Sequence, residues 1–575
     1  MNSLGGINMG ILDIIFILIL FIVVVALAIP LGKYMSRVFT GQRTFMTPIM
    51  EPVERFIYRL IGTDETKEMN WKQYAYALIV LNIIGIIFLF VLQLIQGYLP
   101  LNPEGFSGVS WDSALNTAIS FVTNTNWQGY AGETTMSYLT QMTGLAVQNF
   151  LSAAIGIAAL LVLIRGFTRK NTDKIGNFWI DITRASLYVL LPIAVILAIL
   201  LASQGVVQTF SPYVTAHTLE GVNQTIAVGP VASQEAIKMI GSNGGGFFNA
   251  NSAHPFENPN AITDILEIMA ILLIPISLVF TFGYLIKNFK QGLAIFAAMT
   301  ILFTIGMGIA IYTESQPNPI LEKMGVTGSN LEGKEVRFGV TQSVLWGVAT
   351  TDVSNGGVNS MHDSVMPLTG LVYMFNMCTG EVIYGGLGVG LIGMLFYVIL
   401  SMFVAGLMIG RTPEFLGKKL GPPEMGLSVI PIVLPHVAIL TLSAIAISTT
   451  VGLSSLANPS SHGLSEILYA YLSTIGNNGS AFAGLSANTL FYNLTGGLAM
   501  LIGRFATIIP AIALAGLLAQ KGKVQMTSAS FPTTGPLFVI IVVAVVILLG
   551  ALTFFPVFTL GPILDHLFLY GGHIT

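Results

Sequence analysis

Cysteine and charged residues are scarce in this sequence. One cysteine, Cys378, occurs in 575 residues, and Asp, Glu, Lys and Arg together make up only 9%. A single cysteine excludes a disulfide framework and a metal site built from several thiolates. Hydrophobic residues make up 54% of the chain, and the mean hydropathy is +0.78. A soluble domain could not bury that much apolar surface, so the composition predicts a polytopic membrane protein.

Catalytic signatures are also missing. The sequence has no G-x-x-x-x-G-K-[ST] phosphate loop, no H-E-x-x-H, no G-x-S-x-G and no D-K-T-G phosphorylation motif. Its seven histidines are scattered without metal-ligand spacing, and no basic run indicates a nucleic-acid partner. We therefore expect neither ATP hydrolysis by this chain itself nor an organic cofactor, and we expect membrane lipid as its surroundings.

Lys and Arg occur in a few clusters. The positive-inside rule places these clusters in the cytoplasm, so the Gly/Asn-rich segments between them belong near the outer face of a cell membrane. The first nine residues and the stretch after Phe555 carry no Lys or Arg, so both termini are expected outside. The clusters are Lys33, Arg37, Arg43, Arg55 and Arg59; Arg165, Arg169, Lys170 and Lys174; Lys287 and Lys290; Arg411, Lys418 and Lys419; and Lys521 and Lys523.

Four outer segments share one pattern. They read "SFVTNTNWQGYAGE" (120–133), "MIGSNGGGFFNANS" (239–252), "ATTDVSNGGVNSMHD" (349–363) and "LSTIGNNGSAFAGLS" (472–486). Their aligned triplets are Asn124, Thr125 and Asn126; Ser242, Asn243 and Gly244; Ser354, Asn355 and Gly356; and Asn477, Asn478 and Gly479. The third positions are 118, 112 and 123 residues apart. This near-constant period predicts one unit used four times.

Each triplet follows a short helical segment, at about 113–122, 233–240, 341–349 and 466–474, and each segment is too short to span a bilayer. The unit is therefore helix, pore helix, loop and helix, arranged around a pseudo-fourfold pore in an all-α fold. The predicted units cover 73–170, 171–288, 289–424 and 425–524. An N-terminal helix with a cytoplasmic segment (1–72) and a final helix with a tail (525–575) bring the total to about ten transmembrane helices.

Irregular backbone at membrane depth persists only where it is buried in protein or lines a wet cavity. A ring of such loops can replace the hydration shell of an ion with carbonyl oxygens. The aligned triplets carry no formal charge, which favours a monovalent cation such as K⁺ over a divalent one. A single "SNGGG" would be read as an ordinary loop; four at matched spacing favour a pore. Gln128 could face the pore mouth or cap its loop, whereas Trp127, Phe247 and Phe248 are expected to pack.

The motifs "NTNWQ", "SNGGGFFNANSAHPFENP", "GGVNSMHDS", "GRTPEFLGKK" and "NNGSAFAGL" resemble the potassium-binding subunit (KdpA) of the bacterial Kdp potassium-transporting ATPase, over essentially the whole chain. The resemblance extends to the wider superfamily of Trk- and Ktr-like K⁺ transporters. It implies a subunit that takes K⁺ from outside and passes it through an intramembrane tunnel. The implied partners are a P-type ATPase subunit, a single-span subunit and often a very small single-span subunit.

The resemblance also assigns a filter role to individual residues. One departure is Asn126, which stands where the superfamily favours glycine, so the ring is expected to be asymmetric. The residues that receive the filter role are Asn124, Thr125, Gln128, Ser242, Asn243, Gly244, Ser354, Asn355, Gly356, Asn477, Asn478 and Gly479.

Two long apolar stretches each contain a lone charge. Glu381 is the only charge between Asp363 and Arg411, and it lies 25 residues after Gly356; Arg504 lies 25 residues after Gly479. The first stretch is too long for one straight span, so we expect a break in the glycine-rich segment 378–390. Isolated intramembrane charges are costly and are usually functional or paired. Glu381 and Arg504 could steer K⁺ sideways beneath the filter, or could form a static ion pair.

The favoured function is the K⁺-binding and translocating subunit of an ATP-driven uptake pump. Two alternatives remain open from the sequence. One is a passive or ion-gradient-driven K⁺ transporter of the Trk type, which would work without an ATPase subunit. The other is a membrane-embedded enzyme, and the missing catalytic motifs count against it.

Overall fold

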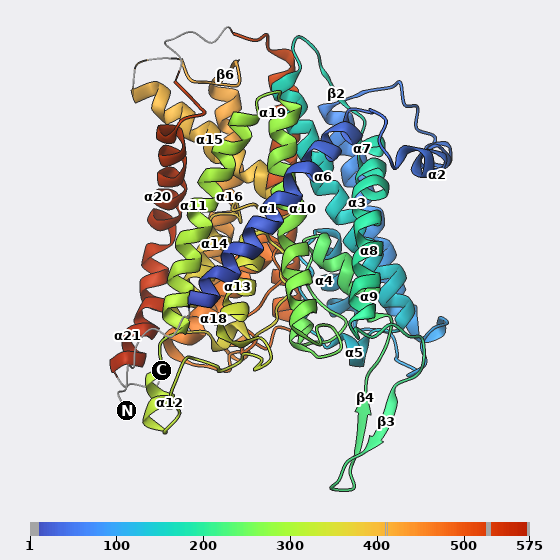
Figure 1. The fold of residues 1–575 in the computed structure, drawn as a ribbon, viewed down its shortest axis with the longest axis vertical. Coiled ribbons are helices and arrows are strands. Elements are labelled where there is room, and N and C mark those ends of the chain that lie inside the picture. Colours follow the sequence, from blue (N-terminus) through green and yellow to red (C-terminus); the bar gives the residue numbers. More distant parts are fainter. Residues whose placement is uncertain (1–10, 409, 411, 525–530, 572–575) are drawn as a thin grey trace.

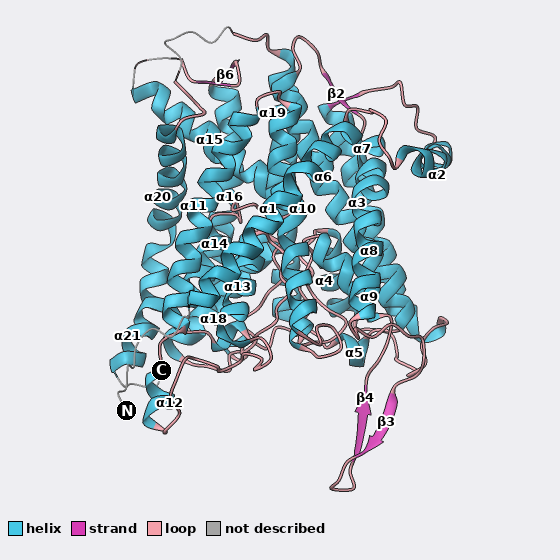
Figure 2. Cartoon of the chain, in the orientation of Figure 1, coloured by secondary structure: helices cyan, strands magenta, loops and turns pink. Residues whose placement is uncertain are grey.

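The described part of the chain contains ten helices long and apolar enough to cross a membrane. The computed structural model describes residues 11–408, 410, 412–524 and 531–571, and Figures 1 and 2 show that helices dominate it. The helices long and apolar enough to cross a membrane confirm the predicted all-helical polytopic fold. The spans are α1 (Ile11–Phe39), α3 (Trp71–Ile95), α6 (Val147–Thr168), α7 (Phe178–Arg184) continuing into α8 (Leu191–Ser203), α10 (Ala261–Leu285), α11 (Phe289–Glu314), α15 (Val389–Met408), α16 (Pro422–Ile447), α19 (Leu490–Gln520) and α20 (Pro536–Phe558).

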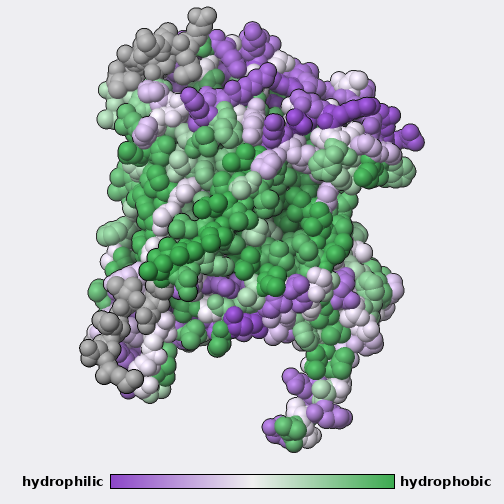
Figure 3. Space-filling model, in the orientation of Figure 1, coloured by the Kyte–Doolittle hydropathy of each residue, from purple (hydrophilic) through white to green (hydrophobic). Residues whose placement is uncertain are grey.

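The surface separates into an apolar belt and two polar ends, as expected for a chain surrounded by lipid (Figure 3). One end, called here the basic end, carries α2 (Thr47–Ile61), β2 (Lys174–Gly176) and β6 (Lys418–Lys419) (Figure 1). The opposite end, called here the hairpin end, carries the hairpin of β3 (Val214–His217) and β4 (Asn223–Ile226), as well as α21 (Leu564–Gly571). Arg411, the first ten residues and the last four lie outside the described residues.

Strands are few in the residues that the structure describes. They form three two-stranded antiparallel sheets, which are made by connecting segments rather than by spans. β1 (Met69–Asn70) pairs with β2, β3 pairs with β4, and β5 (Glu414–Phe415) pairs with β6. These sheets lie at the two polar ends of the molecule (Figure 2), so the membrane-crossing part consists of helices and their breaks.

Helix α1 crosses obliquely over α10 (Figure 1). Gly32 permits the contact, because a Cβ there would lie 2.7 Å from the carbonyl oxygen of Ser277 on α10. The hydroxyl of Thr281 donates to the carbonyl of Gly32 at 3.2 Å. Small residues that let backbones approach closely are the usual means of packing helices inside a membrane, where the hydrophobic effect does not drive helices together.

The predicted break in the third unit is present. Helix α14 (Pro367–Cys378) ends and α15 begins at Val389, and the ten residues between them are not helical. Gly385 has a φ of +51°, and a Cβ on it would lie 2.1 Å from the Cα of Gly390. The segment therefore folds back on itself through a contact between two glycines, which no larger residue could make.

Candidate functional site

Four short helices enter the bundle from the hairpin end (Figure 1). Each overlaps a predicted half-helix. Three of them end two residues before the first residue of a Gly/Asn-rich triplet, and α18 ends immediately before its triplet. These helices are α4 (Trp111–Val122), α9 (Val231–Ile240), α13 (Gly339–Asp352) and α18 (Ser460–Gly476). The triplets that follow are called loop 1 (124–126), loop 2 (242–244), loop 3 (354–356) and loop 4 (477–479).

The same backbone hydrogen bond occurs in all four loops. The N–H of the second triplet residue donates to the carbonyl five residues earlier, in the last turns of the preceding helix. The donor and acceptor pairs are Thr125 to Ser120 at 2.9 Å, Asn243 to Lys238 at 3.1 Å, Asn355 to Thr350 at 3.0 Å and Asn478 to Ser473 at 2.9 Å. The sequence repeat is therefore a structural repeat as well, because equivalent residues make equivalent bonds.

The first and third residues of each loop have a positive φ. The first positions are Asn124 (+67°), Ser242 (+44°), Ser354 (+55°) and Asn477 (+58°); the third are Asn126 (+55°), Gly244 (+76°), Gly356 (+81°) and Gly479 (+100°). The left-handed region favours glycine and tolerates asparagine better than most residues. Backbone conformation thus explains the glycine or asparagine at six of these eight positions; the other two, Ser242 and Ser354, are serines.

The four loops close into a ring. A Cβ on Gly244 of loop 2 would lie 2.0 Å from the carbonyl oxygen of Asn355 in loop 3. A Cβ on Gly356 would lie 1.9 Å from the carbonyl oxygen of Asn478 in loop 4. A Cβ on Gly479 would lie 2.0 Å from the carbonyl oxygen of Thr125 in loop 1. Each third-position glycine therefore touches the middle carbonyl of the next loop, in the order 2, 3, 4 and 1.

Asn126 is the exception, as its identity predicted. Its φ of +55° matches the glycines, and its amide donates to the carbonyl of Gly244 at 3.3 Å and to Oδ1 of Asn149 at 2.5 Å. The side chain thus points to a neighbouring loop and helix while the backbone keeps the shared conformation. The ring keeps its backbone pattern at this position and becomes asymmetric in its side chains.

Side-chain amides also fasten one loop to the next. Asn124 donates to the carbonyl of Ser242 at 2.7 Å, and Asn477 donates to the hydroxyl oxygen of Thr125 at 3.0 Å. The hydroxyl of Ser354 donates to the carbonyl of Asn477 at 2.9 Å. The donors in these bonds are side chains, and most carbonyl oxygens of the triplets accept no side-chain hydrogen bond. Those carbonyl oxygens therefore stay available for other contacts.

Residues outside the predicted set complete this bracing. Asn149 and Ser152 on α6 contact loops 1 and 2: the Ser152 hydroxyl donates to Oδ1 of Asn124 at 2.8 Å, and Asn243 donates to the Asn149 carbonyl at 3.2 Å. Nothing in the sequence pointed to them, because polar residues on an apolar helix could face any neighbour.

Gln128 lies at the edge of the ring and is half-buried. Its Oε1 accepts from the N–H of Gly246 at 2.8 Å, and its Nε2 donates to the carbonyl of the same residue at 3.2 Å. Gln128 therefore joins the end of loop 1 to the segment after loop 2, so it holds two loops together rather than capping its own.

A buried lysine stands behind loop 2. Lys238 on α9 is fully buried, and its ammonium lies 2.7 Å from Glu235 and 2.6 Å from Glu257. It also donates to the carbonyl of Gly245 at 2.8 Å. Two carboxylates offset one ammonium, as a buried charge requires. The sequence already pointed to this cluster, because burying a lysine within a half-helix costs free energy unless acidic partners lie close to it.

The segment after loop 2 supports it. Phe247 and Phe248 are buried, as is Trp127 after loop 1, and the ring of Phe248 stacks on His254 with centroids 3.7 Å apart. Oε1 of Glu257 accepts from the N–H of Phe248 at 2.8 Å. These contacts agree with the expected packing role of the three aromatic residues.

Glu133 joins the segment after loop 1 to the segment after loop 2. Its Oε2 accepts from the N–H of Asn249 at 2.9 Å. Burial raises the pKa of the Glu133 carboxyl above its ordinary value.

The two lone charges do not pair with each other. Oε1 of Glu381, in the break after α14, accepts from Nδ2 of Asn478 at 2.6 Å. Nη2 of Arg504, on the unbroken α19, donates to the carbonyl of Ser152 at 2.6 Å. Among the described residues no ion pair joins Glu381 to Arg504, so the static ion pair considered from the sequence is wrong. Each charge instead contacts a residue of the ring or of its bracing.

A cavity lies next to loop 4. Its volume is about 60 Å³, which gives room for about four water-sized particles. Its lining includes Gly476 and Asn477, residues 378–380 at the start of the break, His436 on α16, and Gly503 beside Arg504. The imidazole of His436 is within hydrogen-bond distance, 2.8 Å, of the Cys378 carbonyl.

One further carboxylate was missed from the sequence. Asp352, the last residue of α13, is fully buried, and neither of its oxygens has a hydrogen-bond partner among the described residues. A buried carboxylate without partners is costly, so Asp352 is a second acidic group of interest near the ring. The quoted motif of loop 3 contains it, but an acidic residue there could equally have faced solvent.

A family model and several known proteins match this chain over nearly its whole length, and their names agree. The family model described as "Potassium-transporting ATPase A subunit" matches residues 18–567. Proteins named "Potassium-transporting ATPase potassium-binding subunit" are 54% identical in Pseudomonas putida, over 96% of this chain and 98% of the relative, and 53% identical in Brucella anthropi, over 96% and 97%. A relative from Herpetosiphon aurantiacus is 52% identical over 96% and 98%.

The fold has a solved counterpart. The crystal structure of the potassium transporter TrkH from Vibrio parahaemolyticus aligns with a TM-score of 0.50 and 13% identity, covering 85% of this chain and 96% of that chain. At that identity the likeness concerns the fold alone. The match of the family model over nearly the whole chain and relatives above 50% identity show that this chain belongs to the potassium-transporting ATPase A subunit family.

Proposed function

We propose that this chain is the K⁺-binding and translocating subunit of an ATP-driven potassium uptake complex, and that loops 1 to 4 are its selectivity filter. The closed ring of loops is the observation that carries the proposal. Three third-position glycines touch the middle carbonyls of the neighbouring loops at separations that exclude a side chain. A ring of backbone carbonyls can replace the water around a cation.

The absence of formal charge in the triplets and the direction of the helix dipoles favour a monovalent cation. The triplets carry no formal charge, so the ring offers carbonyl and side-chain oxygens, which suit K⁺ better than a divalent ion. The C-terminal ends of α4, α9, α13 and α18 meet at the loops, and the negative ends of helix dipoles favour a cation. The site residues proposed for K⁺ are those of the four triplets, with Gln128 at the rim.

The route below the ring is inferred from the cavity. Glu381 contacts loop 4, and Arg504 contacts Ser152, which braces loop 1. The cavity is lined by the chain neighbours of both charges, Gly380, Val382 and Gly503. We infer that the negative Glu381 attracts K⁺ at this point, while the positive Arg504 opposes its direct descent to the cytoplasm. K⁺ is thereby directed sideways, into an intramembrane tunnel that leads to a partner P-type ATPase subunit.

The partners and the orientation follow the family. The names of the relatives describe a subunit of an ATPase, which favours a pump over a Trk-type transporter that works alone. A P-type ATPase subunit, a single-span subunit and a very small single-span subunit are the proposed partners. The basic end faces the cytoplasm and the hairpin end faces outward, which places both termini outside the cell. The unit boundaries proposed from the sequence remain 73–170, 171–288, 289–424 and 425–524.

The direct test is transport. The complex purified with its co-purifying subunits and reconstituted into vesicles is expected to take up Rb⁺, a K⁺ substitute, only when ATP is supplied to the cytoplasmic side. Uptake measured with ATP, without ATP and with the chain alone separates the alternatives. Rb⁺ uptake by this chain alone in the absence of ATP would favour the Trk-type alternative and refute the pump.

Gln128→Ala provides a milder test of the ring. The substitution removes two hydrogen bonds between loops 1 and 2, each contributing about 0.5–1.5 kcal/mol. The sum of about 1–3 kcal/mol is expected to raise the K⁺ concentration for half-maximal ATPase stimulation between roughly fivefold and 150-fold. Gln316→Ala is the matched control, since Gln316 bonds a carbonyl of its own helix. An equal change in both variants would contradict a role of Gln128 in joining the loops.

A further inference from the structure

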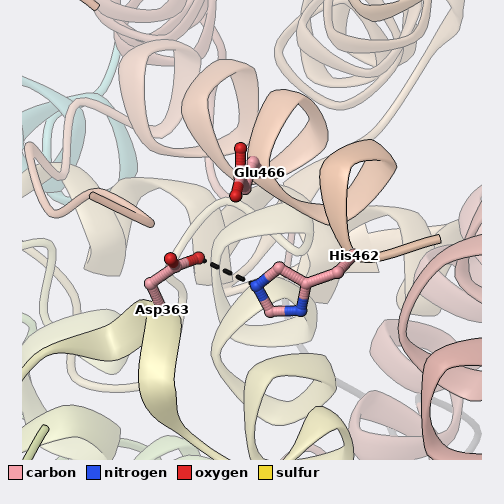
Figure 4. Close-up of side chains that lie close together, drawn as sticks. All are labelled: Asp363, His462 and Glu466. Atoms are coloured by element: carbon pink, nitrogen blue, oxygen red, sulfur yellow. Dashed lines mark hydrogen bonds and ion pairs between the residues drawn. The ribbon is translucent and has the colours of Figure 1, made fainter. Parts of the chain in front are cut away.

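A cluster of metal-ligand side chains lies at the hairpin end, away from the ring. Asp363 follows loop 3, and His462 and Glu466 lie in the first turns of α18 (Figure 4). One potential ligand atom from each residue lies within 4.8 Å of the others. The site was not visible in the sequence, because Asp363 is 99 residues from His462 and only the fold brings them together.

His462 is oriented for this position by another carboxylate. Its Nδ1 is 2.9 Å from Oδ2 of Asp565, a residue of α21, and its Nε2 points to Oδ1 of Asp363 at 3.0 Å. Histidines that bind metals usually use one ring nitrogen for the metal and give the other N–H to a carboxylate or carbonyl. His462 and Glu466 are four residues apart on one helix, so their side chains share a face.

Glu466 has an oxygen without a protein partner. The residue is fully buried; its Oε1 accepts from Nδ2 of Asn458 at 2.7 Å, while Oε2 has no hydrogen-bond partner among the described residues. A buried carboxylate oxygen left unsatisfied carries a desolvation cost of about 1–3 kcal/mol or more. A bound cation would remove that cost.

Gly484 packs directly against the two carboxylates. A Cβ at this position would lie 2.4 Å from Oε1 of Glu466 and 2.6 Å from Oδ2 of Asp363. The N–H of Gly484 donates to Oδ2 of Asp363 at 3.1 Å. The close approach of this backbone therefore requires glycine, and any larger residue would push against both carboxylates.

We propose that Asp363, His462 and Glu466 bind a divalent transition-metal ion of the Zn²⁺ type. One imidazole nitrogen and two carboxylate oxygens form a usual protein donor set for zinc, leaving a fourth position for water. Ca²⁺ and Mg²⁺ prefer oxygen ligands alone. Zinc bonds of about 2.0–2.2 Å place ligand atoms about 3.3 Å apart, so the cluster has to contract by at most about 1.5 Å.

The metal would link three distant parts of the chain. Asp363 follows loop 3, α18 leads into loop 4, and Asp565 holds the ligand histidine from the C-terminal helix. An ion that binds only the folded protein stabilises it by mass action. Zinc is therefore expected to raise the melting temperature of the chain by fastening the outer ends of these segments.

The test uses Zn²⁺ alone as the probe and does not depend on transport. The full chain, purified in detergent with its co-purifying subunits and stripped with a chelator, is titrated with Zn²⁺ by calorimetry. X-ray absorption at the zinc edge then reports the ligands. One zinc per chain is expected, with one imidazole nitrogen and otherwise oxygen ligands, and with a rise in melting temperature.

Two variants and one control complete the experiment. Glu466→Gln removes a ligand charge at almost constant shape, and Gly484→Ala places a methyl group against both carboxylates and displaces them; each is expected to weaken zinc binding at least tenfold. His217→Ala is the control, since His217 lies on the exposed hairpin. The alternative is a metal-free clamp in which a protonated His462 donates to both aspartates. Absence of stoichiometric zinc, or equal affinity in Glu466→Gln and the unsubstituted chain, would overturn the proposal.

Discussion

Gly244→Ala is expected to remove high-affinity K⁺ stimulation almost completely. The Cβ would lie 2.0 Å from the carbonyl oxygen of Asn355, and the φ of +76° is unfavourable for any residue with a Cβ. The backbone conformation costs about 1–2 kcal/mol and overpacking about 1–3 kcal/mol. A total of about 2–5 kcal/mol corresponds to a loss of K⁺ affinity between roughly 30-fold and several thousand-fold.

The measurement is ATPase stimulation by K⁺ and by Na⁺ in the purified complex. Gly244→Asp adds a negative charge to the same position and should reduce discrimination between the two ions further. Gly308→Ala is the matched control, because Gly308 on α11 has open space around the position of a Cβ. Melting curves and co-purification of the partner subunits show whether each variant folds. A folded Gly244→Ala variant with unchanged affinity and discrimination would refute the filter assignment.

The second large effect is expected from exchanging the lone charges, as Glu381→Arg with Arg504→Glu. An arginine at position 381 would face the amide donor of Asn478, and a carboxylate at position 504 would face the carbonyl of Ser152. Each replacement therefore places a donor against a donor or an acceptor against an acceptor in a buried site. An uncompensated charge there costs about 3–5 kcal/mol. K⁺ uptake is therefore expected to fall more than roughly 100-fold.

Neutral substitutions separate charge from structure. Glu381→Gln keeps an oxygen that can accept from Asn478, so the melting temperature should stay nearly constant while uptake falls. Because no ion pair joins the two residues, the stability effects of Glu381→Gln and Arg504→Gln should add within about 0.5 kcal/mol. Normal ATP-dependent uptake in the exchanged variant would refute the steering role. A strongly non-additive stability effect in the double-mutant cycle would show that the two residues interact as an ion pair after all.

Much of the fold follows from short-range patterns. Apolar runs of sufficient length predict the spans, so the final helix expected within 525–575 is found at Pro536–Phe558. The break in the third unit was predictable because the 47 residues between Asp363 and Arg411 cannot form one straight span across a bilayer of about 30 Å, and dense glycine marks where the chain turns. Half-helices are too short to span and precede loops, so their number and positions were also predictable.

The candidate site was only partly predictable. The four triplets could be found because they repeat, but their partners could not, since Asn149 and Ser152 lie on a helix whose rotation is set by packing. One of the two alternatives for Glu381 and Arg504, the static ion pair, was wrong for the same reason. Equal spacing from the glycines allowed the two charges to meet, whereas the break displaces Glu381 and the continuous α19 carries Arg504 toward α6.

The exception at Asn126 has a consequence for how such a ring can change over time. In a ring of four identical chains, each substitution occurs four times, so a cost of about 1 kcal/mol per copy becomes about 4 kcal/mol. A cost of about 1 kcal/mol lowers ion affinity roughly fivefold, whereas a cost of about 4 kcal/mol lowers it roughly 700-fold. Here all four loops belong to one chain, so each quarter can be altered alone at a tolerable cost. An asparagine can replace glycine in loop 1, and a lysine can stand behind loop 2, without the other quarters having to accept the same change.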